Sequence, residues 1–323
     1  MDGLLIVDKP VGPTSHDVVA RVRRVLGERR IGHTGTLDPA ASGVLPLVVG
    51  RATRLAQFLN AADKAYEATV GLGVETDTFD SLGRTVGVSH PGPFPTREEV
   101  DRALDEFRGA FLQQPPVYSA KKIGGKRSHR LARGRQRDVL RHAHTLPAIQ
   151  TLPALPAPAL VTAHAIDIVG YEDGRVTIVV TCSAGFYVRS LAHDLGDRLG
   201  IGAHLEALRR TRSGDAGIAT AVPLGIVERD RGAAIAALVP LAHVLSALTS
   251  VILTDEGARR AGHGRDLGPS DFAGGTAGIP QTAEAQGSGP PPRFRLLDRQ
   301  GNLIGVAESA RTPGLLHPTV ILV

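Results

Sequence analysis

The sequence predicts an α+β fold: a main body of strands with interspersed helices, followed by a small β-rich module. Two observations support this prediction. Short apolar runs typical of strands are interspersed with stretches whose apolar residues recur at helical spacing. The length of 323 residues is that of about two domains, and residues 246–323 carry three short strand patterns. We therefore expect a first domain over residues 1–245 and a second over residues 246–323.

The first elements follow from apolar spacing and from residues that start or end helices. Leu4 to Val7 is a run typical of a short buried strand. Ser15 can cap a helix whose valines and Leu26 lie at helical spacing, and Gly27 is a suitable end. The segment 31–43 is rich in Gly, Thr and Pro and is expected to be a loop. The same reasoning predicts strands at Val44–Val49 and Tyr66–Leu72, a helix at Thr53–Leu59, and a helix after the capping pair of Thr96 and Glu99.

The second half of the chain predicts a hairpin, two helices and the strands of the C-terminal module. Val161–Val169 and Arg175–Cys182 flank the turn-forming residues 172–174. Val188–Leu199 and Ala203–Arg210 are expected to be helices. Segments near 138–160 and 272–292, rich in Pro with Ala or Gly, are expected to be mobile insertions. Three further strands are expected at Phe294–Leu297, Leu303–Ala307 and Thr319–Val323.

Cysteine content and apolar stretches exclude several classes of protein. Cys182 is the one cysteine, so neither an intramolecular disulfide nor a four-cysteine zinc site can form. Its strand context favours a buried, inert thiol. The apolar run at the N-terminus is too short for a signal peptide. The segment 232–254 has no formal charge, but its alanines and Pro240 favour a buried, broken helix over a membrane span.

The usual signatures of cofactor and metal sites are missing. The sequence has no Walker loop, no G-x-G-x-x-G after a strand and no H-E-x-x-H. His142 and His144 lie two residues apart but would need further ligands to hold a metal. We therefore expect no cofactor and no metal. An enzyme built from this chain would work with its own side chains.

The distribution of charge favours a nucleic-acid partner. The chain has 37 basic and 32 acidic residues, a formal net charge of +5 and a pI near 9.7. The segment 109–137 holds eight Lys or Arg residues and no Asp or Glu. Such density is typical of a nucleic-acid contact, and a solvated basic loop is the alternative.

The segment 31–45 contains the strongest motif in the sequence. Gly32, Gly35 and Gly43 permit close backbone approach, and Asp38 precedes a proline, which favours extended backbone at the aspartate. On local pattern alone, Asp38 is either a turn former or a catalytic carboxylate. The segment closely resembles motif II of the TruB family of tRNA pseudouridine synthases. In that family the Asp of G-x-L-D-P-x-A-x-G is catalytic.

Other blocks of the sequence resemble the same family in the same order. Together they extend over about 200 residues, which makes the resemblance more specific than any one motif. The blocks are Asp8–Ser15, Lys64–Ala68 with Thr76–Asp80, Pro115–Lys121 with Lys126, Gly185–Leu191 with Asp194–Gly196, and Ala203–Leu205 with Leu208–Gly214.

This resemblance implies a mixed, mainly antiparallel sheet of the pseudouridine synthase fold and a catalytic set of three residues. Asp38 would assist cleavage of the glycosidic bond, and Arg189 would keep its carboxylate charged. Tyr66 would stack on the uracil and serve as the base at C5. If the chain is extended from Tyr187 to Arg189, these two side chains share one face and line one pocket. Without the resemblance, Arg189 reads as a surface arginine at a helix start, and Tyr66 as a core aromatic residue.

The target base of such an enzyme lies inside folded RNA and must be flipped out. By resemblance, His33 would fill the gap left by the base, although a loop histidine is the plain alternative. Leu205 would contribute an apolar wall, and Asp80 would join the polar network near Tyr66. The remaining residues expected to contact substrate are Tyr187, Lys9, Lys64, Lys121 and Lys126.

The resemblance implies a cytoplasmic, monomeric enzyme that isomerises the T-loop uridine, position 55, of tRNA. The expected partner is the tRNA T-arm, with no membrane and no guide RNA. Residues 246–323 resemble the PUA-like RNA-binding domain of bacterial members. Two alternatives stay open: a non-catalytic RNA-binding or RNA-folding protein on the same fold, and a pseudouridine synthase for another RNA.

Overall fold

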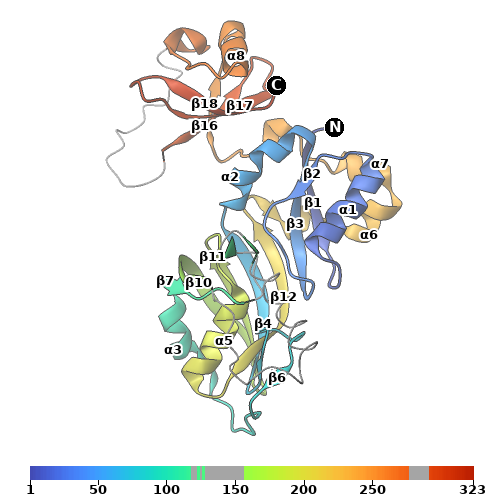
Figure 1. Cartoon of the computed structure of the whole chain (residues 1–323), viewed down its shortest axis with the longest axis vertical. Helices are drawn as coiled ribbons and strands as arrows, with labels where there is room; N and C mark the ends of the chain where they lie inside the picture. The colour runs from blue at the N-terminus through green and yellow to red at the C-terminus, as the bar shows by residue number, and fades with distance from the viewer. Residues whose placement is uncertain (118–121, 124–125, 128–155, 276–290) are drawn as a thin grey trace, which may run out of the picture. The chain divides into compact units, whose positions relative to one another are not determined.

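The computed structural model describes residues 1–117, 122–123, 126–127, 156–275 and 291–323 (Figure 1). The described chain divides into two compact units. Unit 1 comprises Met1–Leu37, Val44–Ala61 and Asp215–Val323, and unit 2 comprises Asp38–Gly43 and Ala62–Gly214. Neither unit is a continuous stretch of sequence. The expected insertions near 138–160 and 272–292 lie largely outside the described residues.

Unit 2 is built on a mainly antiparallel sheet, as expected. The central strand β4 is antiparallel to β11 on one side and to β12 on the other, and β12 pairs in parallel with the first residues of β3. Helix α5 (Val188–Leu199) packs against β12 and contacts α3 (Arg97–Leu104). In spatial order the strands are the start of β3 (Ala41–Val49), β12 (Ala203–Ser213), β4 (Lys64–Leu72), β11 (Arg175–Cys182), β10 (Ala159–Glu172) and β7 (Gly109–Gln113).

The expected hairpin is confirmed as β10 and β11. Their register places Glu172 opposite Arg175, and Asp173 and Gly174 both have positive φ at the turn. Alternate side chains of β11 are buried, as period-2 patterning requires when one face of a strand meets the core. Cys182 is one of them and is 1% exposed.

The helix predicted over 203–210 is wrong, because this segment is strand β12. Its Ala, Leu, Glu and Arg residues are strong helix formers, which explains the error. In the fold, β12 has a hydrogen-bonded neighbour on each side, β4 and β3. Ala203 and Leu205 are buried, and the register shifts between Leu205 and Ala207. Ladder hydrogen bonds and side-chain burial outweigh the local propensity at this position.

Unit 1 begins with β1 (Gly3–Lys9) and helix α1 (Ser15–Leu26). The helix ends as expected, with Gly27 in the left-handed conformation at φ 69°. The expectation that Ser15 caps it is wrong. Thr14 is the N-cap, and it forms a reciprocal capping box with Asp17.

The expected loop 31–43 is partly strand. β2 (Ile31–His33) pairs antiparallel with the end of β3, and β3 itself begins at Ala41. The expected helix near residues 53–59 is present as η1 and α2. The remaining short elements are η1 (Gly50–Leu55), α2 (Ala56–Asn60), β5 (Glu75–Thr76), β6 (Thr85–Val86), η2 (Asp105–Phe107), β8 (Lys122–Ile123), β9 (Lys126–Arg127), β13 (Ala216–Gly217), η3 (Ile218–Thr220), β14 (Val222–Pro223), α6 (Leu224–Arg229), α7 (Arg231–Ala236), η4 (Leu241–His243) and η5 (Pro269–Asp271).

The C-terminal part of unit 1 holds a four-stranded sheet and the helix α8 (Asp255–Gly262). The three strands expected here are confirmed, although the last begins three residues earlier than expected. The charge-free segment 232–254, expected to be a buried helix broken at Pro240, contains the end of the short helix α7, the single turn η4 after Pro240 and the strand β15 (Thr249–Ile252). In spatial order the strands are β15 (Thr249–Ile252), β16 (Arg293–Leu297), β17 (Leu303–Ser309) and β18 (Leu316–Ile321).

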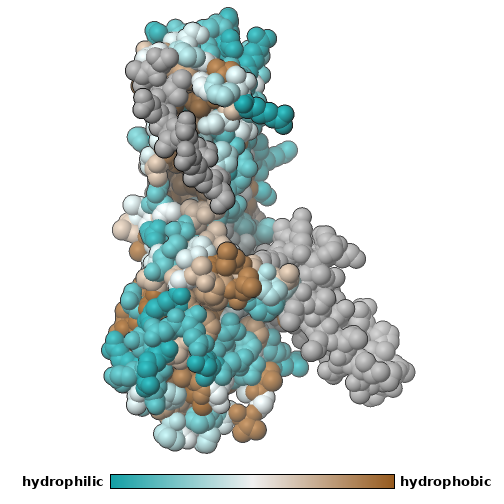
Figure 2. Space-filling model, turned by 90° about the vertical axis from the view of Figure 1, so that its left-hand side faces the viewer, coloured by the Kyte–Doolittle hydropathy of each residue, from teal (hydrophilic) through white to brown (hydrophobic). Residues whose placement is uncertain are grey.

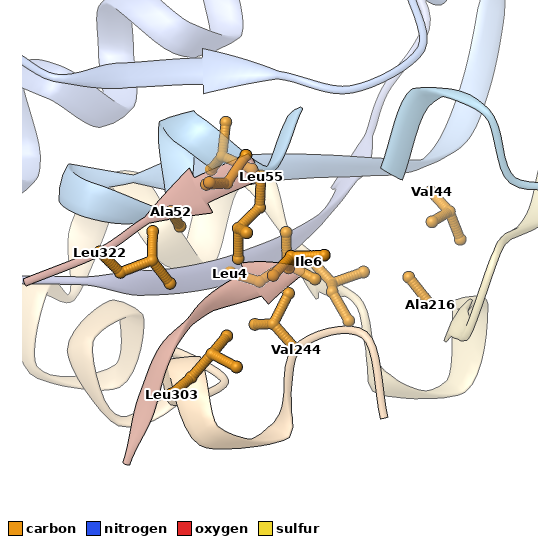
Figure 3. Close-up of a cluster of buried hydrophobic side chains, with 12 residues drawn as sticks. Leu4, Ile6, Val44, Ala52, Leu55, Ala216, Val244, Leu303 and Leu322 are labelled. Atoms are coloured by element: carbon orange, nitrogen blue, oxygen red, sulfur yellow. The ribbon is translucent and has the colours of Figure 1, made fainter. Parts of the chain in front are cut away.

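A hydrophobic cluster within unit 1 joins residues from both ends of the sequence (Figure 3). Leu4 and Ile6 of β1 belong to the same cluster as Leu303 of β17 and Leu322. Arg51 adds a hydrogen bond from Nη1 to the Leu322 carbonyl at 2.9 Å. The β-rich module has a core of its own. The β-rich module therefore contributes to two clusters: its own core, and the cluster that it shares with residues near the start of the chain.

The visible surface is mainly hydrophilic, with hydrophobic side chains in small, separate patches (Figure 2). Leu82, Val88 and Leu112 are among the exposed apolar residues. Scattered side chains of this kind are normal for a globular protein. No helix among the described residues is long and apolar enough to cross a membrane.

Candidate active site

Asp38 lies at a turn that is fixed on both sides. The residue before it, Leu37, is held by Ser15, whose Oγ accepts from the Leu37 N–H at 2.9 Å and donates to its carbonyl at 3.0 Å. The Asp38 carbonyl accepts from Ala41 N at 3.0 Å. The Asp38 side chain remains 41% exposed. A carboxylate on a rigid turn is thereby open to a bound molecule.

The guanidinium of Arg189 is the cation that faces Asp38. Arg189 Nη2 lies 2.9 Å from Asp38 Oδ2, and Nη1 lies 3.5 Å from Asp80 Oδ2. Nη1 also donates to the Thr78 carbonyl at 3.2 Å. The Arg189 side chain is 7% exposed. A buried guanidinium is costly unless it is paired and hydrogen-bonded, and these three oxygens meet that need.

The condition that Tyr187 to Arg189 is extended is not met. Helix α5 begins at Val188, so Arg189 lies in its first turn and only Tyr187 is extended. Gln113 holds that residue, since its Oε1 accepts from the Tyr187 N–H and its Nε2 donates to the Tyr187 carbonyl. A helix start at this point aims Arg189 by helical rather than strand geometry.

Asp80 is fixed by the loop that carries it. The residue is 6% exposed, and its Oδ1 accepts from Thr78 Oγ1 at 2.6 Å and from Leu82 N at 3.1 Å. Its other carboxylate oxygen faces Arg189. The backbone of Asp80 also bridges to Leu205 on β12. Asp80 is therefore a preset anion that positions the guanidinium between two carboxylates.

Tyr66 lies on β4, directly opposite Arg210 on β12. Burial raises the pKa of the Tyr66 hydroxyl, while the charge of Arg210 and its hydrogen bond to the hydroxyl act to lower it. The negative charge of Asp38 raises the Tyr66 pKa further. The phenol is thus neutral near pH 7, with a guanidinium at its oxygen. Arg210 itself is 1% exposed.

Gly43 explains how β3 approaches β12 at this point. Its φ is +101°, a conformation that favours glycine. A Cβ atom at Gly43 would lie 2.2 Å from the Arg210 carbonyl oxygen. The third glycine of the motif is therefore required by backbone packing against the strand that carries Arg210.

The carboxylates and Arg189 line a small, open pocket. Leu205, expected as an apolar wall, lies in its lining. The lining residues are Asp38, Ala40, Ala41, Asp80, Arg189, Leu205, Glu206, Ala207 and Leu208.

Comparison with known proteins accounts for this arrangement. Residues 23–188 match the model of the TruB family pseudouridylate synthase N-terminal domain, and residues 189–245 match the tRNA pseudouridylate synthase B C-terminal domain. The chain belongs to the TruB family. It is an enzyme that isomerises uridine to pseudouridine, which confirms the activity expected from the sequence.

Relatives extend over most or all of the chain. A tRNA pseudouridine synthase B of Solibacter usitatus (strain Ellin6076) is 38% identical over 100% of both chains. That of Symbiobacterium thermophilum is 43% identical and covers 82% of each chain. A chain of the crystal structure of a Cbf5-Nop10-Gar1 complex has a TM-score of 0.70 and 26% identity, covering 99% of this chain and 85% of that one. The pseudouridine synthase fold is thereby confirmed.

Two lysines of the TruB blocks are buried. Lys9 is 0% exposed, and its Nζ donates to the carbonyls of Pro10 and Pro13 at 2.9 Å each. Lys64 is 6% exposed and donates to the Ala62 carbonyl, and burial together with the nearby Arg210 lowers its pKa to about 8. These hydrogen bonds stabilise the loops that flank β1 and β4.

The other expected contacts of this TruB enzyme are placed only in part. His33 lies on β2 in unit 1, in an edge-to-face contact with His16 at 5.2 Å between ring centroids. Lys126 lies on β9, in a two-stranded hairpin with β8. Lys121 lies outside the described residues.

Arg210 and Thr78 are the site residues that sequence reasoning missed. Both residues lie inside blocks that resemble the family, but neither was assigned to the site from the sequence. No local signal singles out Arg210 from its arginine neighbours. Its importance appears only when β12 pairs with β4 and brings it opposite Tyr66.

Proposed function

We propose that this TruB enzyme converts uridine 55 in the T-loop of tRNA to pseudouridine. The choice of tRNA is supported by the full-length relative from Solibacter usitatus, which is named tRNA pseudouridine synthase B. The observation that carries the catalytic proposal is the contact of 2.9 Å between an open carboxylate, Asp38, and a buried guanidinium, Arg189. That pair keeps an anion available where a nucleotide can reach it.

The reaction breaks the C1′–N1 bond, turns the uracil, and joins C1′ to C5. It ends when the hydrogen on C5 leaves as a proton and N1 gains one, so the base keeps its composition. Asp38 assists cleavage, as nucleophile or as base, and must be ionised in either role. Arg189 favours that ionised form because an adjacent cation stabilises a carboxylate. Asp80 balances the charge of Arg189 and fixes its direction.

Tyr66 stacks on the uracil and takes the C5 proton in this proposal. Its hydroxyl must first give up its own proton, which burial opposes. Arg210 favours the phenolate by its charge and by its hydrogen bond to the hydroxyl. We therefore assign Arg210 to support Tyr66 at the late step, as Arg189 supports Asp38 at the early one.

Binding of the tRNA is assigned to residues around this site. His33 fills the space left by the flipped base, which offsets part of an unstacking cost of a few kcal/mol. Lys121 and Lys126, in the basic segment 109–137, contact T-arm phosphates. Residues 246–323, as a PUA-like domain, contact the acceptor stem or elbow. The enzyme acts as a cytoplasmic monomer without a guide RNA.

Asp38→Asn tests the proposal. The amide has nearly the same shape as the carboxylate but no charge, so turnover should fall at least about 100-fold while tRNA affinity stays within about twofold. Pseudouridine formation is measured by release of tritium from tRNA labelled at uridine C5, with purified protein and no other component. Turnover within about tenfold of the wild type would remove Asp38 from the central role.

The choice of substrate needs its own control. A tRNA transcript with cytidine at position 55 should bind but release no tritium from its other uridines. Equal release from both transcripts would favour another uridine or another RNA as the target. Tight tRNA binding without turnover by the wild type would favour the RNA-folding alternative.

A further inference from the structure

One face of helix α5 holds the loop that carries Asp80. Arg189 and His193 lie four residues apart and therefore on the same face of the helix. Arg189 meets the Thr78 carbonyl and the Asp80 carboxylate. One turn further on, the His193 ring packs on Phe79, with ring centroids 3.9 Å apart and an interplanar angle of 49°. The same loop is therefore contacted twice.

Phe79 has a backbone conformation that needs external support. Its φ is 64°, in the left-handed region, which a bulky residue adopts only with backbone strain. Its N–H donates to the Thr76 carbonyl at 3.1 Å, and its own carbonyl accepts from Leu205 N at 3.0 Å. These bonds fix one side of the residue, and the His193 ring covers its side chain.

The position of Phe79 links this strain to the site. Its two chain neighbours, Thr78 and Asp80, supply the oxygens that hold the guanidinium of Arg189. If Phe79 relaxed to a negative φ, the peptide groups on both sides would rotate. The carbonyl and the carboxylate would then no longer converge on Arg189.

We propose that His193 is a positioning residue, whose ring keeps Phe79 left-handed and so directs Arg189 at Asp38. This inference rests on the proposed function and deepens it. The contact that matters is the ring and not the charge. His193 Nδ1 lies 3.6 Å from Asp197 Oδ1, and Nε2 lies 4.0 Å from Glu75 Oε1, both longer than a hydrogen bond.

Two substitutions of His193 distinguish the effect of its aromatic ring from the effect of its polar nitrogen atoms. His193→Gln keeps a polar side chain without a ring, and His193→Phe keeps a ring without nitrogen. In the full-length enzyme, His193→Gln should lower single-turnover kcat about tenfold, with KM and tRNA affinity within about twofold, because a small misdirection of a catalytic group is costly. His193→Phe should keep at least about a third of the wild-type rate.

A matched control uses a second histidine–phenylalanine pair among the described residues of unit 2. His90 and Phe94 contact edge to face at 5.9 Å between centroids, and neither residue supplies an oxygen that holds Arg189. His90→Gln should leave kcat unchanged. A wild-type rate for His193→Gln, or a rate for His193→Phe as low as that for His193→Gln in folded protein, would overturn the inference.

Phe79→Asn approaches the same contact from the other side. Asparagine tolerates the left-handed conformation but has no ring to pack on His193. Its loss of kcat should equal that of His193→Gln, and the double variant should be no slower than the slower single variant. Additive losses would contradict the proposal. Asp38→Asn in the same assay distinguishes the failures: if it is inactive while His193→Gln is normal, only the role of His193 falls.

Discussion

The guanidinium of Arg189 contacts two carboxylates and one carbonyl of the candidate site. A planar guanidinium can face two carboxylates and a carbonyl at once because its donors point in fixed directions. Asp38, Asp80 and Thr78 use that geometry. The arrangement leaves the Asp38 side chain open at one end while Asp80 is enclosed. The same cation thus pairs with one exposed carboxylate, Asp38, and one enclosed carboxylate, Asp80.

Arg189→Lys tests that geometry. An ammonium keeps the charge but cannot present two parallel sets of donors, so it should satisfy Asp38 or Asp80 but not both. We expect kcat to fall about 100-fold with tRNA affinity close to wild type, and the melting temperature to fall because a buried charge loses part of its pairing. Single-turnover rates and a melting curve measure this. A rate within about threefold of wild type would show that charge alone is sufficient.

The carboxyl of Asp194 should make the unfolding free energy of the enzyme depend on pH. Burial raises the pKa of its carboxyl from the ordinary 3.8 to about 6, and the neighbouring His193 offsets only part of this rise. The folded state then binds a proton more tightly than the unfolded state, so stability falls as pH rises from about 4 to about 6. Above pH 6 the folded enzyme carries the full cost of the buried charge.

Asp194→Asn should remove this cost. After allowance for solvent screening of a half-buried group, the variant should gain about 1 kcal/mol of unfolding free energy at pH 8. At pH 4 it should gain almost nothing, since the wild-type carboxyl is already protonated in the folded state. Urea unfolding at both pH values measures the difference. An equal gain at both would mean that packing, not ionisation, causes the effect.

At the scale of elements, the contact between β3 and β12 depends on Gly43. Gly43→Ala places a methyl group against the Arg210 backbone and forces an unfavourable φ. We expect a loss of about 2–4 kcal/mol of unfolding free energy and a loss of activity. Denaturant unfolding measures the first. Gly27→Ala, at an open helix end with φ 69°, is the control for the φ cost alone and should lose about 1 kcal/mol.

Local patterns predicted correctly those elements in which the intrinsic propensity of the residues and their tertiary environment favour the same secondary structure. The alternation in β11 and the glycine after α1 are examples, and both are confirmed. The segment 203–210 shows the limit, because its helix-forming residues become the strand β12 between two others. Motif resemblance located Asp38 and Arg189, which the structure brings together. It did not reveal the left-handed Phe79 or the pairing of Tyr66 with Arg210, because both depend on tertiary register.

At the scale of the whole molecule, the charge distribution predicts how tRNA binding responds to salt. The basic segment 109–137 has no acidic residue, so it should release counterions when it meets phosphates. Each lost phosphate contact should reduce the slope of log affinity against log salt by about 0.7 to 0.9. To test this, we would replace five basic residues of the segment with glutamine: Lys121, Lys122, Lys126, Arg127 and Arg130. This variant should show a smaller slope than the wild type.

Filter binding of tRNA at several salt concentrations measures that slope. A control variant replaces three arginines outside this segment with glutamine: Arg102, Arg198 and Arg175. Each of them already forms a hydrogen bond or an ion pair within unit 2, so the slope should stay nearly unchanged. A wild-type slope for the variant of segment 109–137 would show that this segment is a solvated loop.

The cluster shared by Leu4, Ile6, Leu303 and Leu322 has a consequence for synthesis on the ribosome. The first strand emerges roughly 300 residues before its last partners, which at about 5–20 residues per second is a delay of about 15–60 s. Through that interval the apolar side chains of β1 lack the part of their native cover that Leu303 and Leu322 supply. A nascent chain in that state is a substrate for chaperones, and the cluster becomes complete only after Leu322 has been synthesised.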